Sequence, residues 1–329
     1  MIANKIKKGD EVRVIAPSGS LARLDDNNFK IAKERLESLG LTVTISKNAY
    51  NVDKYGTSSI EERIQDIHEA FLDKNVKMII CAIGGYSVIQ ILEKIDYELI
   101  KNNPKIIVGY SDNTALLNAI YTKTGLVTYL GPNFADFAVK LGFEYTFDFF
   151  KKIVLSNSDI VVEDSLKFSD DQWYINQDNR VFEKNEGRKV VNEGKAIGKI
   201  IGGNLCTLQL LQGTEFMPDL NDSILFIEDD DLVGDCFALE FDRNLHSLML
   251  QPNFNNVKGI IVGRVQLGAK MGVSELQDLL KAKEQLKNIP IIINVDFGHT
   301  RPLLTIPIGG IVEVNNGEIR FIQNEEINI

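Results

Sequence analysis

A serine stands in the stretch "GYSDN" at 109–113, directly after the apolar run "PKIIV" and before a segment with helical patterning. A serine at such a turn can act as a nucleophile in acyl transfer if a nearby base takes its proton. It can also cap the helix that follows, because serine is a preferred N-cap residue. The stretch is not the G-x-S-x-G nucleophile motif, because Asn113 replaces the second glycine. By pattern alone, the cap is the favoured role for Ser111.

Histidine is the usual base near neutral pH, and the chain contains three histidines. His68 and His246 lie in segments that are patterned as helices. His299 instead follows the apolar run "IPIIINVDF" and stands between Gly298 and "TRP". The carboxyl end of a strand is a typical place for a catalytic group. A loop histidine that only bonds to the backbone is an equally open interpretation of His299.

A histidine base needs a carboxylate that orients its ring. The stretch "SILFIEDDD" at 223–231 supplies one, because Glu228 ends the apolar run and would emerge at the end of a strand. The three aspartates that follow are better interpreted as a solvated acidic loop. We expect no metal site here, since no histidine or further carboxylate has the spacing of a ligand set.

An acyl-transfer serine also needs hydrogen-bond donors for the oxyanion. One candidate is the backbone amide of Asp112, which opens the helix after Ser111. Another is the stretch "IGGY" at 83–86, where Gly84 and Gly85 allow the backbone to approach a substrate closely. A plain turn or a phosphate-binding loop remains possible there. Neither G-x-G-x-x-G nor G-x-x-x-x-G-K-[ST] occurs in the chain, which weakens the nucleotide interpretations.

These residues follow a regular alternation of elements in the first half of the chain. Strands are predicted at 11–19, 41–47, 76–85 and 104–110, and helices at 27–40, 58–74, 87–102 and 113–125. Nearly continuous apolar strands separated by helices indicate a parallel sheet that is covered on both faces. The fold class is therefore α/β, with an N-terminal parallel-sheet domain at 1–155.

The amino-acid composition changes after this domain. Residues 156–194 are polar, contain the single tryptophan Trp173, and are predicted to form a linker with an extended insert. Residues 195–329 alternate strands and helices again and contain the turn "NNG" of a predicted hairpin. We expect a second, C-terminal domain of mixed strands and helices.

Composition limits the classes of function. The 329 residues suffice for about two domains, and 44% of them are hydrophobic. The net charge of −10 argues against nucleic acid or an anionic membrane as partner. The N-terminus lacks the apolar core of a signal peptide and no run is long enough to span a membrane, so we expect a cytoplasmic protein. The three cysteines are odd in number and widely spaced, which argues against disulfides and structural zinc.

Six motifs together resemble the LD-carboxypeptidase family of serine peptidases, which includes the microcin-C self-immunity peptidases. The matching stretches are "IAPSG" at 15–19, "IGGYSVIQILEKIDY" at 83–97, "GYSDNTALLNAIYTKTGLVTYLGP" at 109–132, "GKIIGGNLCTL" at 198–208, "LFIED" at 225–229 and "DFGHTRP" at 296–302. The resemblance implies that the C-terminal mixed α/β domain is the smaller one and that the active site lies at the interface of the two domains. It also implies a Ser–His–Glu triad that needs no metal or cofactor. It assigns Ser111 as nucleophile, His299 as general base and Glu228 as orienting carboxylate.

The resemblance also suggests further site residues and a subgroup. It implies oxyanion donors at the amides of Gly85 and Asp112, substrate contacts at Gly84, Tyr86 and Trp173, and a homodimer. Peptidoglycan-recycling members tend to read "RGGYG" where this chain has "IGGYS", so the microcin-immunity branch is the closer one. In that branch a tryptophan of the insert stacks on the nucleotide part of the substrate. An aromatic anchor that packs the insert onto the body is an equally open role for Trp173.

We therefore expect a serine carboxypeptidase that hydrolyses an amide bond near the C-terminus of a small peptide or peptidyl-nucleotide. One alternative is a muramoyl-tetrapeptide LD-carboxypeptidase. Another is a non-catalytic peptide- or sugar-binding protein in which Ser111 only caps its helix. We also expect Trp173 to be exposed or poorly ordered when no ligand is bound, because its segment is polar and is expected to be mobile.

Overall fold

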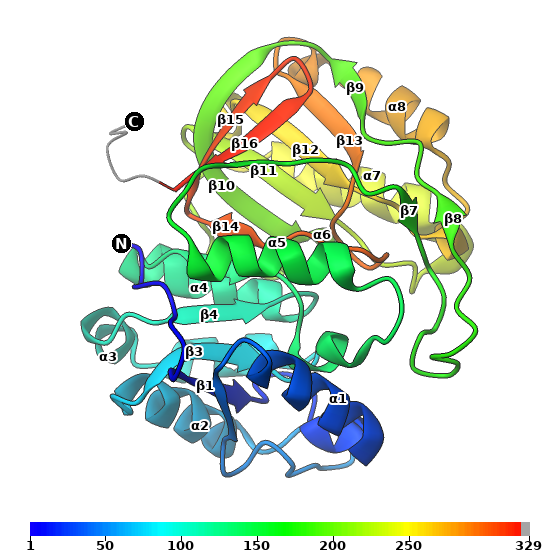
Figure 1. Cartoon of the computed structure of the whole chain (residues 1–329). Helices are drawn as coiled ribbons and strands as arrows, with labels where there is room; N and C mark the ends of the chain where they lie inside the picture. Colours follow the sequence, from blue (N-terminus) through cyan, green and yellow to red (C-terminus); the bar gives the residue numbers. More distant parts are fainter. Residues whose placement is uncertain (324–329) are drawn as a thin grey trace.

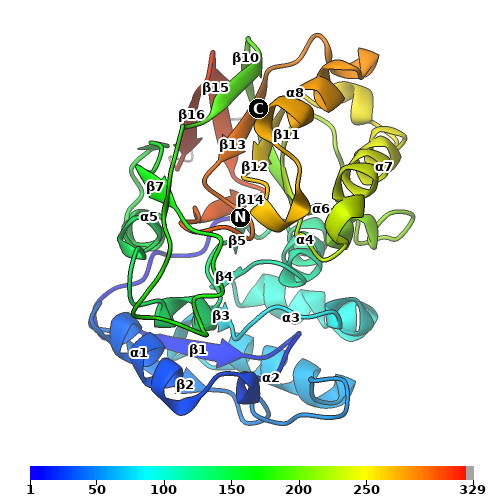
Figure 2. The same cartoon turned by 90° about the vertical axis from the view of Figure 1, so that its right-hand side faces the viewer.

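The computed structural model describes residues 1–323, which form two sheets with helices packed around them (Figures 1 and 2). The first sheet has six strands in the order β14-β5-β4-β3-β1-β2. Their bounds are β1 Glu11–Ile15, β2 Thr42–Ile45, β3 Val76–Cys81, β4 Ile106–Gly109, β5 Thr128–Leu130 and β14 Ile306–Ile308. All pairs are parallel except β14 with β5. The predicted α/β class with an N-terminal parallel sheet is confirmed.

The helices of the first half cover both faces of this sheet. Their bounds are α1 Asp26–Glu37, α2 Ile60–Leu72, α3 Tyr97–Asn102, α4 Asn113–Thr124 and α5 Glu144–Leu155. In Figure 2, α1 and α5 lie on one side of the strands, and α2, α3 and α4 lie on the other. Strands β3 and β4 are accordingly buried on both faces. Of the residues in these two strands, only Lys77 of β3 is exposed. This explains why they read as nearly unbroken apolar runs.

The single helix predicted over 87–102 is wrong. The segment forms a 3₁₀ helix, η2, at Val88–Lys94 and a separate short helix, α3. Asp96 lies between them with an extended backbone, and its carboxylate accepts a hydrogen bond from the N–H of Leu99. An aspartate that caps a new helix in this way competes with continuation of the preceding one.

The second sheet has eight strands in the order β6-β16-β15-β10-β11-β12-β13-β9. Their bounds are β6 Ile160–Val161, β9 Lys189–Asn192, β10 Lys195–Asn204, β11 Ser223–Glu228, β12 Gly259–Gly263, β13 Ile291–Val295, β15 Ile311–Asn315 and β16 Glu318–Ile322. The helices beside it are α6 Leu205–Gln209, α7 Phe237–Met249 and α8 Val273–Lys281. Strands β10 to β13 are parallel, so their carboxyl ends lie at one edge.

The segment 156–194 takes part in this second sheet. Strands β6 and β9 are its two edge strands, while β7 Lys167–Phe168 and β8 Glu183–Lys184 pair only with each other. The insert is therefore attached to the body at both of its ends. The loop that carries Trp173 lies between β7 and β8.

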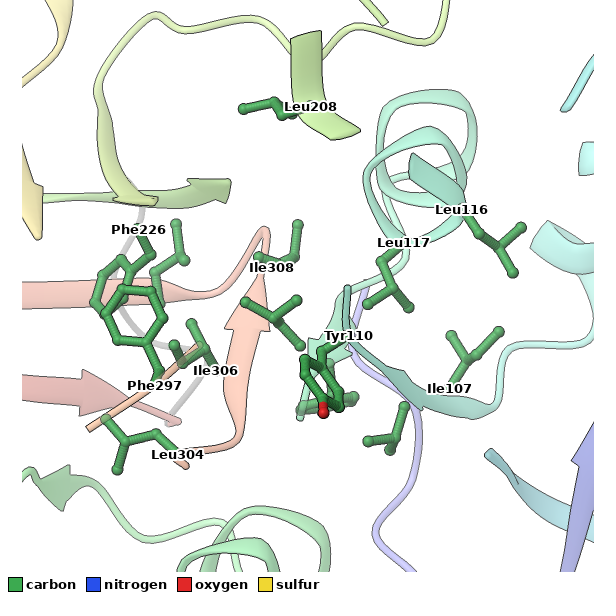
Figure 3. Packing of buried hydrophobic residues seen from close by; sticks show 14 of the residues in the cluster. Ile107, Tyr110, Leu116, Leu117, Leu208, Phe226, Phe297, Leu304, Ile306 and Ile308 are labelled. Carbon is green, nitrogen blue, oxygen red and sulfur yellow. The ribbon is translucent and has the colours of Figure 1, made fainter. Parts of the chain in front are cut away.

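The two sheets share one hydrophobic core. Strand β14 comes from the C-terminal part of the chain but pairs with β5 of the first sheet. Figure 3 shows Ile306 and Ile308 of this strand beside Tyr110 and Leu117, with Phe226 and Phe297 of the second half next to them. Within residues 1–323, no helix has the length and apolar character required to cross a membrane.

Candidate active site

Ser111 lies in the turn between β4 and α4. Its backbone φ is 61°, in the left-handed region that a residue with a side chain rarely adopts. The side-chain amide of Asn113 supports the turn by donating to the carbonyls of Ile83 and Tyr110. Strained residues of this kind are concentrated at functional sites. Among the described residues, the Ser111 hydroxyl bonds to His299 and not to a helix amide, so the cap interpretation is wrong.

His299 lies in the loop after β13 and bonds on both sides of its ring. Its Nδ1 is 2.7 Å from Oε2 of Glu228, and its Nε2 is 3.0 Å from Oγ of Ser111. Glu228 is the last residue of β11 and is only 2% exposed. The structure thus brings together three residues that each follow or end a different parallel strand. This is the geometry in which a carboxylate orients an imidazole toward a hydroxyl.

The charge of Glu228 controls the titration of His299. Burial alone would lower the pKa of the imidazole, but the charge of Glu228 and its hydrogen bond outweigh burial and raise the pKa to about 9. The next residue, Asp229, is also affected. Burial, and then the charge of Glu228, raise the pKa of Asp229 to about 7.

The glycine turn after β3 packs against the serine. A Cβ added to Gly84 would lie 3.0 Å from Cβ of Ser111 and 3.1 Å from its Oγ. Within residues 1–323, the backbone N–H groups of Gly85 and Asp112 donate to no protein acceptor. Unpaired donors beside a nucleophile are suited to stabilise an oxyanion. Whether these two amides do so stays a prediction.

Sequence analysis missed the structural role of the Asp112 side chain. Its buried Oδ2 accepts hydrogen bonds from Oγ of Ser18 at 2.5 Å and from the N–H groups of Ser87 at 2.8 Å and Val88 at 3.0 Å. One carboxylate therefore joins the serine turn, the glycine turn and the loop after β1. The only available signal was the position of Asp112 next to Ser111, because its partners lie up to 94 residues away.

The two aromatic residues expected to contact substrate differ in their surroundings. Tyr86 is 77% exposed beside the glycine turn. Trp173 is only 5% exposed, so the expectation of an exposed tryptophan is wrong. The guanidinium of Arg301 lies 5.8 Å from the centre of its ring. Polar neighbours in the sequence did not reveal that this side chain folds back onto the loop of His299.

The remaining histidines and the acidic loop have other partners. His68 accepts a hydrogen bond from the N–H of Asp96, and His246 is exposed on α7. Donor atoms of Cys206, Asp229 and Asp230 lie within 4.8 Å of one another, the one such group in residues 1–323. The side-chain amide of Asn204 bonds to all three of these residues: its N–H groups donate to both carboxylates, and its oxygen accepts from the thiol of Cys206.

Comparison with family models matches both halves of the chain. A model described as the LD-carboxypeptidase N-terminal domain matches residues 12–131, and one described as the C-terminal domain matches residues 197–314. The chain is 46% identical over 310 residues to YocD of Bacillus subtilis (strain 168), whose name describes it as a carboxypeptidase. That alignment covers 94% of each chain.

Two further curated relatives carry more specific names. The microcin C7 self-immunity protein MccF of Escherichia coli is 33% identical, over 94% of this chain and 91% of its own. A Bacillus subtilis (strain 168) protein named as a murein peptide carboxypeptidase is 32% identical, over 95% and 91%.

Solved structures of similar proteins superpose on nearly the whole chain. An MccF-like protein from Bacillus anthracis superposes with a TM-score of 0.97 at 50% identity, covering 98% of this chain and all of the other. MccF in complex with aspartyl sulfamoyl adenosine superposes with a TM-score of 0.87 at 31% identity, covering 98% of both chains.

Proposed function

The chain belongs to the LD-carboxypeptidase family, as its motifs indicated, and from this premise we propose that it is a serine carboxypeptidase with a Ser111–His299–Glu228 triad. The observation that carries the proposal is the continuous hydrogen-bonded chain from Glu228 through both ring nitrogens of His299 to Ser111. Such a chain can activate a hydroxyl that is otherwise a weak nucleophile.

The reaction follows from these distances. Oγ of Ser111 attacks the carbonyl carbon of the scissile amide while Nε2 of neutral His299 takes its proton. The imidazolium returns this proton to the leaving amine as the C–N bond breaks, which leaves an acyl-enzyme. Water then attacks the ester with His299 as base again, and the freed Ser111 recovers its proton. Glu228 holds the ring orientation and stabilises its charged form throughout.

The negative charge that develops on the carbonyl oxygen needs donors. We assign this role to the backbone N–H groups of Gly85 and Asp112, which have no protein acceptor within residues 1–323. The carboxylate of Asp112 fixes the distance between them, because it bonds to the turn that contains Gly85. Gly84 and Tyr86 flank this turn and are proposed to contact the substrate.

The proposed substrate is a small peptide or peptidyl-nucleotide of the microcin-C type. Support comes from MccF, a relative named for microcin C7 self-immunity, whose solved structures include an aspartyl sulfamoyl adenosine complex. A muramoyl tetrapeptide is the second candidate, supported by the murein peptide carboxypeptidase among the relatives. If Trp173 stacks on a nucleobase, its side chain must first leave the buried position beside Arg301.

Turnover of a two-member panel tests this proposal. Aspartyl sulfamoyl adenosine and a muramoyl tetrapeptide are incubated with wild-type protein, Ser111→Ala and His299→Ala. We expect the single variants to lose several orders of magnitude in kcat, and the double variant to lose little more, because triad members act as a unit.

Ser247→Ala serves as the matched control, since the hydroxyl of Ser247 on α7 bonds to Gln212 and not to the triad. Binding of either compound without hydrolysis by the wild-type protein would identify a non-catalytic binding protein and contradict the proposal. We also propose a cytoplasmic location, on the sequence features given above, and a homodimer, on family resemblance alone. Light scattering of the purified protein tests the dimer.

A further inference from the structure

The loop that carries His299 is held at both ends by buried ion pairs. At its start, Asp296 pairs with Arg264 at 2.5 Å, and both belong to the second half of the chain. At its end, Arg301 pairs with Asp136 at 2.6 Å. Asp136 lies in the 3₁₀ helix η3 at Phe134–Ala138, directly after the first sheet's β5. The second pair therefore ties the histidine loop to the part of the molecule that carries Ser111.

Arg301 contacts the surroundings of the triad at two more points. Its Nη2 donates to the hydroxyl of Tyr110 at 3.2 Å, and its Nη1 donates to the carbonyl of His299 at 3.4 Å. The ring of Tyr110 in turn packs against the imidazole, with ring centres 5.4 Å apart. Tyr110 precedes Ser111 directly in the chain, so one guanidinium touches the backbone of the base and the neighbour of the nucleophile.

The insert closes over the same guanidinium. The backbones of Ser169 and Arg301 exchange two hydrogen bonds, of 2.7 and 2.9 Å. The guanidinium of Arg301 lies over the ring of Trp173, 5.8 Å from its centre, and only 14% of the arginine side chain remains exposed. Three segments far apart in the sequence thus converge on Arg301.

The loop that carries His299 needs a contact that fixes its position relative to Ser111. Gly298, next to His299, has a φ of 105° and no side chain to pack, so it does not fix the ring. Glu228 orients the imidazole but lies on the second sheet, and cannot set its distance to Ser111 on the first. The pair between Arg301 and Asp136 spans that gap. An arginine suits the position because its planar fork can bond to several acceptors at once.

We propose that Arg301 is a positioning residue that sets the distance between His299 and Ser111 through its ion pair with Asp136. The inference rests on the proposed function and deepens it. The 3.0 Å contact of His299 Nε2 with Ser111 depends on this pair, whereas the contact with Glu228 does not.

The first test measures turnover of whichever panel substrate the wild-type protein hydrolyses. Arg301→Lys keeps the charge but loses the fork, and we expect kcat to fall about 10- to 100-fold because small displacements of catalytic groups have effects of that size. KM should change less than about threefold. Asp136→Asn breaks the same pair from the other side, and should match it if Arg301→Lys fails to fold.

Arg188→Lys is the matched control for this measurement. Arg188 pairs with Asp164 at 2.7 Å within the segment 156–194 and does not contact the triad. A rise in KM at constant kcat for Arg301→Lys would make Arg301 a substrate-binding residue and overturn the proposal. A kcat equal to that of the Arg188→Lys control would overturn it as well.

The second test needs no substrate and separates this inference from the proposed function. The ¹⁵N chemical shift of His299 Nε2 is measured with and without Ser111→Ala, which removes its hydroxyl partner. In the otherwise wild-type protein this substitution should move the shift. In the Arg301→Lys background it should have no effect, because the contact is already lost.

An unchanged response to Ser111→Ala in the Arg301→Lys background contradicts the positioning role, even if the enzyme is active. A lost response in a protein that hydrolyses neither compound supports the positioning role and contradicts the proposed function.

Discussion

His299 is unusual at the residue scale because its half-buried imidazole lies beside a carboxylate that has almost no access to solvent. Glu228 is 2% exposed, and its Oε1 has no hydrogen-bond partner among the described residues. A carboxylate so poorly solvated interacts strongly with the one cation that it can bind. The outcome is a pKa of about 9 for His299, well above the ordinary value of 6.5.

This pKa predicts the pH dependence of the reaction. Only neutral imidazole can take the proton of Ser111, so kcat/KM should rise with pH until His299 is deprotonated. The rise should be centred near pH 9, the raised pKa of His299, and not near its ordinary value of 6.5. Glu228→Gln removes the charge that raises the pKa, and should move the rise to lower pH while reducing the plateau. Rates measured from pH 5 to 10.5 check this.

A profile centred near 6.5 in the wild-type protein would contradict the strong coupling between His299 and Glu228.

The same coupling makes the folded protein more stable at low pH, where the reaction is slow. Because the folded-state pKa is raised, its contribution to the free energy of unfolding is fully present below about pH 6.5 and is lost as the pH rises through about 9.

At the scale of elements, the candidate active site is formed where several turns meet and does not belong to any one strand or helix. The turn after β3 and the turn after β4 are joined by the carboxylate of Asp112, and the loop after β1 joins them through Ser18. Arg63 of α2 adds a second connection, since its guanidinium donates to the carbonyls of Pro17 and Ser87. Helix and sheet packing therefore determines the spacing of groups that lie in loops.

Gly84→Ala tests how closely these turns are fitted. The added methyl would lie 3.0 to 3.1 Å from the side chain of Ser111, tighter than ordinary contact, while its backbone φ lies outside the left-handed region. We expect kcat to fall by about tenfold or more through displacement of Ser111, with a change in the free energy of unfolding of about 1 kcal/mol or less.

Gly272→Ala is the control, because its added methyl would meet no atom closer than 3.6 Å. Steady-state kinetics and urea unfolding of both variants are compared with the wild-type protein. If Gly84→Ala retains full kcat, the close contact between the glycine turn and Ser111 does not contribute to turnover.

At the scale of the whole molecule, the two sheets are not independent bodies. Strand β14 leaves the second half to pair with β5, and Ile306 and Ile308 on it are fully buried. The ion pair between Arg301 and Asp136 crosses the same boundary. The domain limits of 1–155, 156–194 and 195–329 stay a prediction, and these crossing contacts indicate that the parts stabilise one another.

We therefore expect a single cooperative unfolding transition. Two probes follow it: fluorescence of the single Trp173 at the insert, and reactivity of Cys81, which is fully buried in β3. Both should change at the same urea concentration, because loss of either part exposes the shared core of the other. Exposed Cys236 should react without urea and serves as internal control.

Separate midpoints for the two probes would show that the halves unfold independently. In that case residues 1–155, expressed alone, should also fold, which the shared strand and core argue against.

Much of this molecule could be predicted from local patterns. Apolar runs separated by amphipathic segments predicted the parallel sheet, and Ser111, Glu228 and His299 were identified because each follows or ends such a run. This works because the two faces of a strand or helix are encoded by residues a few positions apart. The motifs around these residues were specific enough to indicate the family.

Tertiary structure decided what depends on distant residues. The burial of Trp173 and the pairing of β14 with β5 have no signal in the neighbouring sequence. Arg301 and Asp136 are 165 positions apart, and each alone is an ordinary charged residue in a loop. Their significance arises only when the two sheets pack and exclude water from both side chains, because burial is what turns a pair of opposite charges into a fixed distance between the elements that carry them.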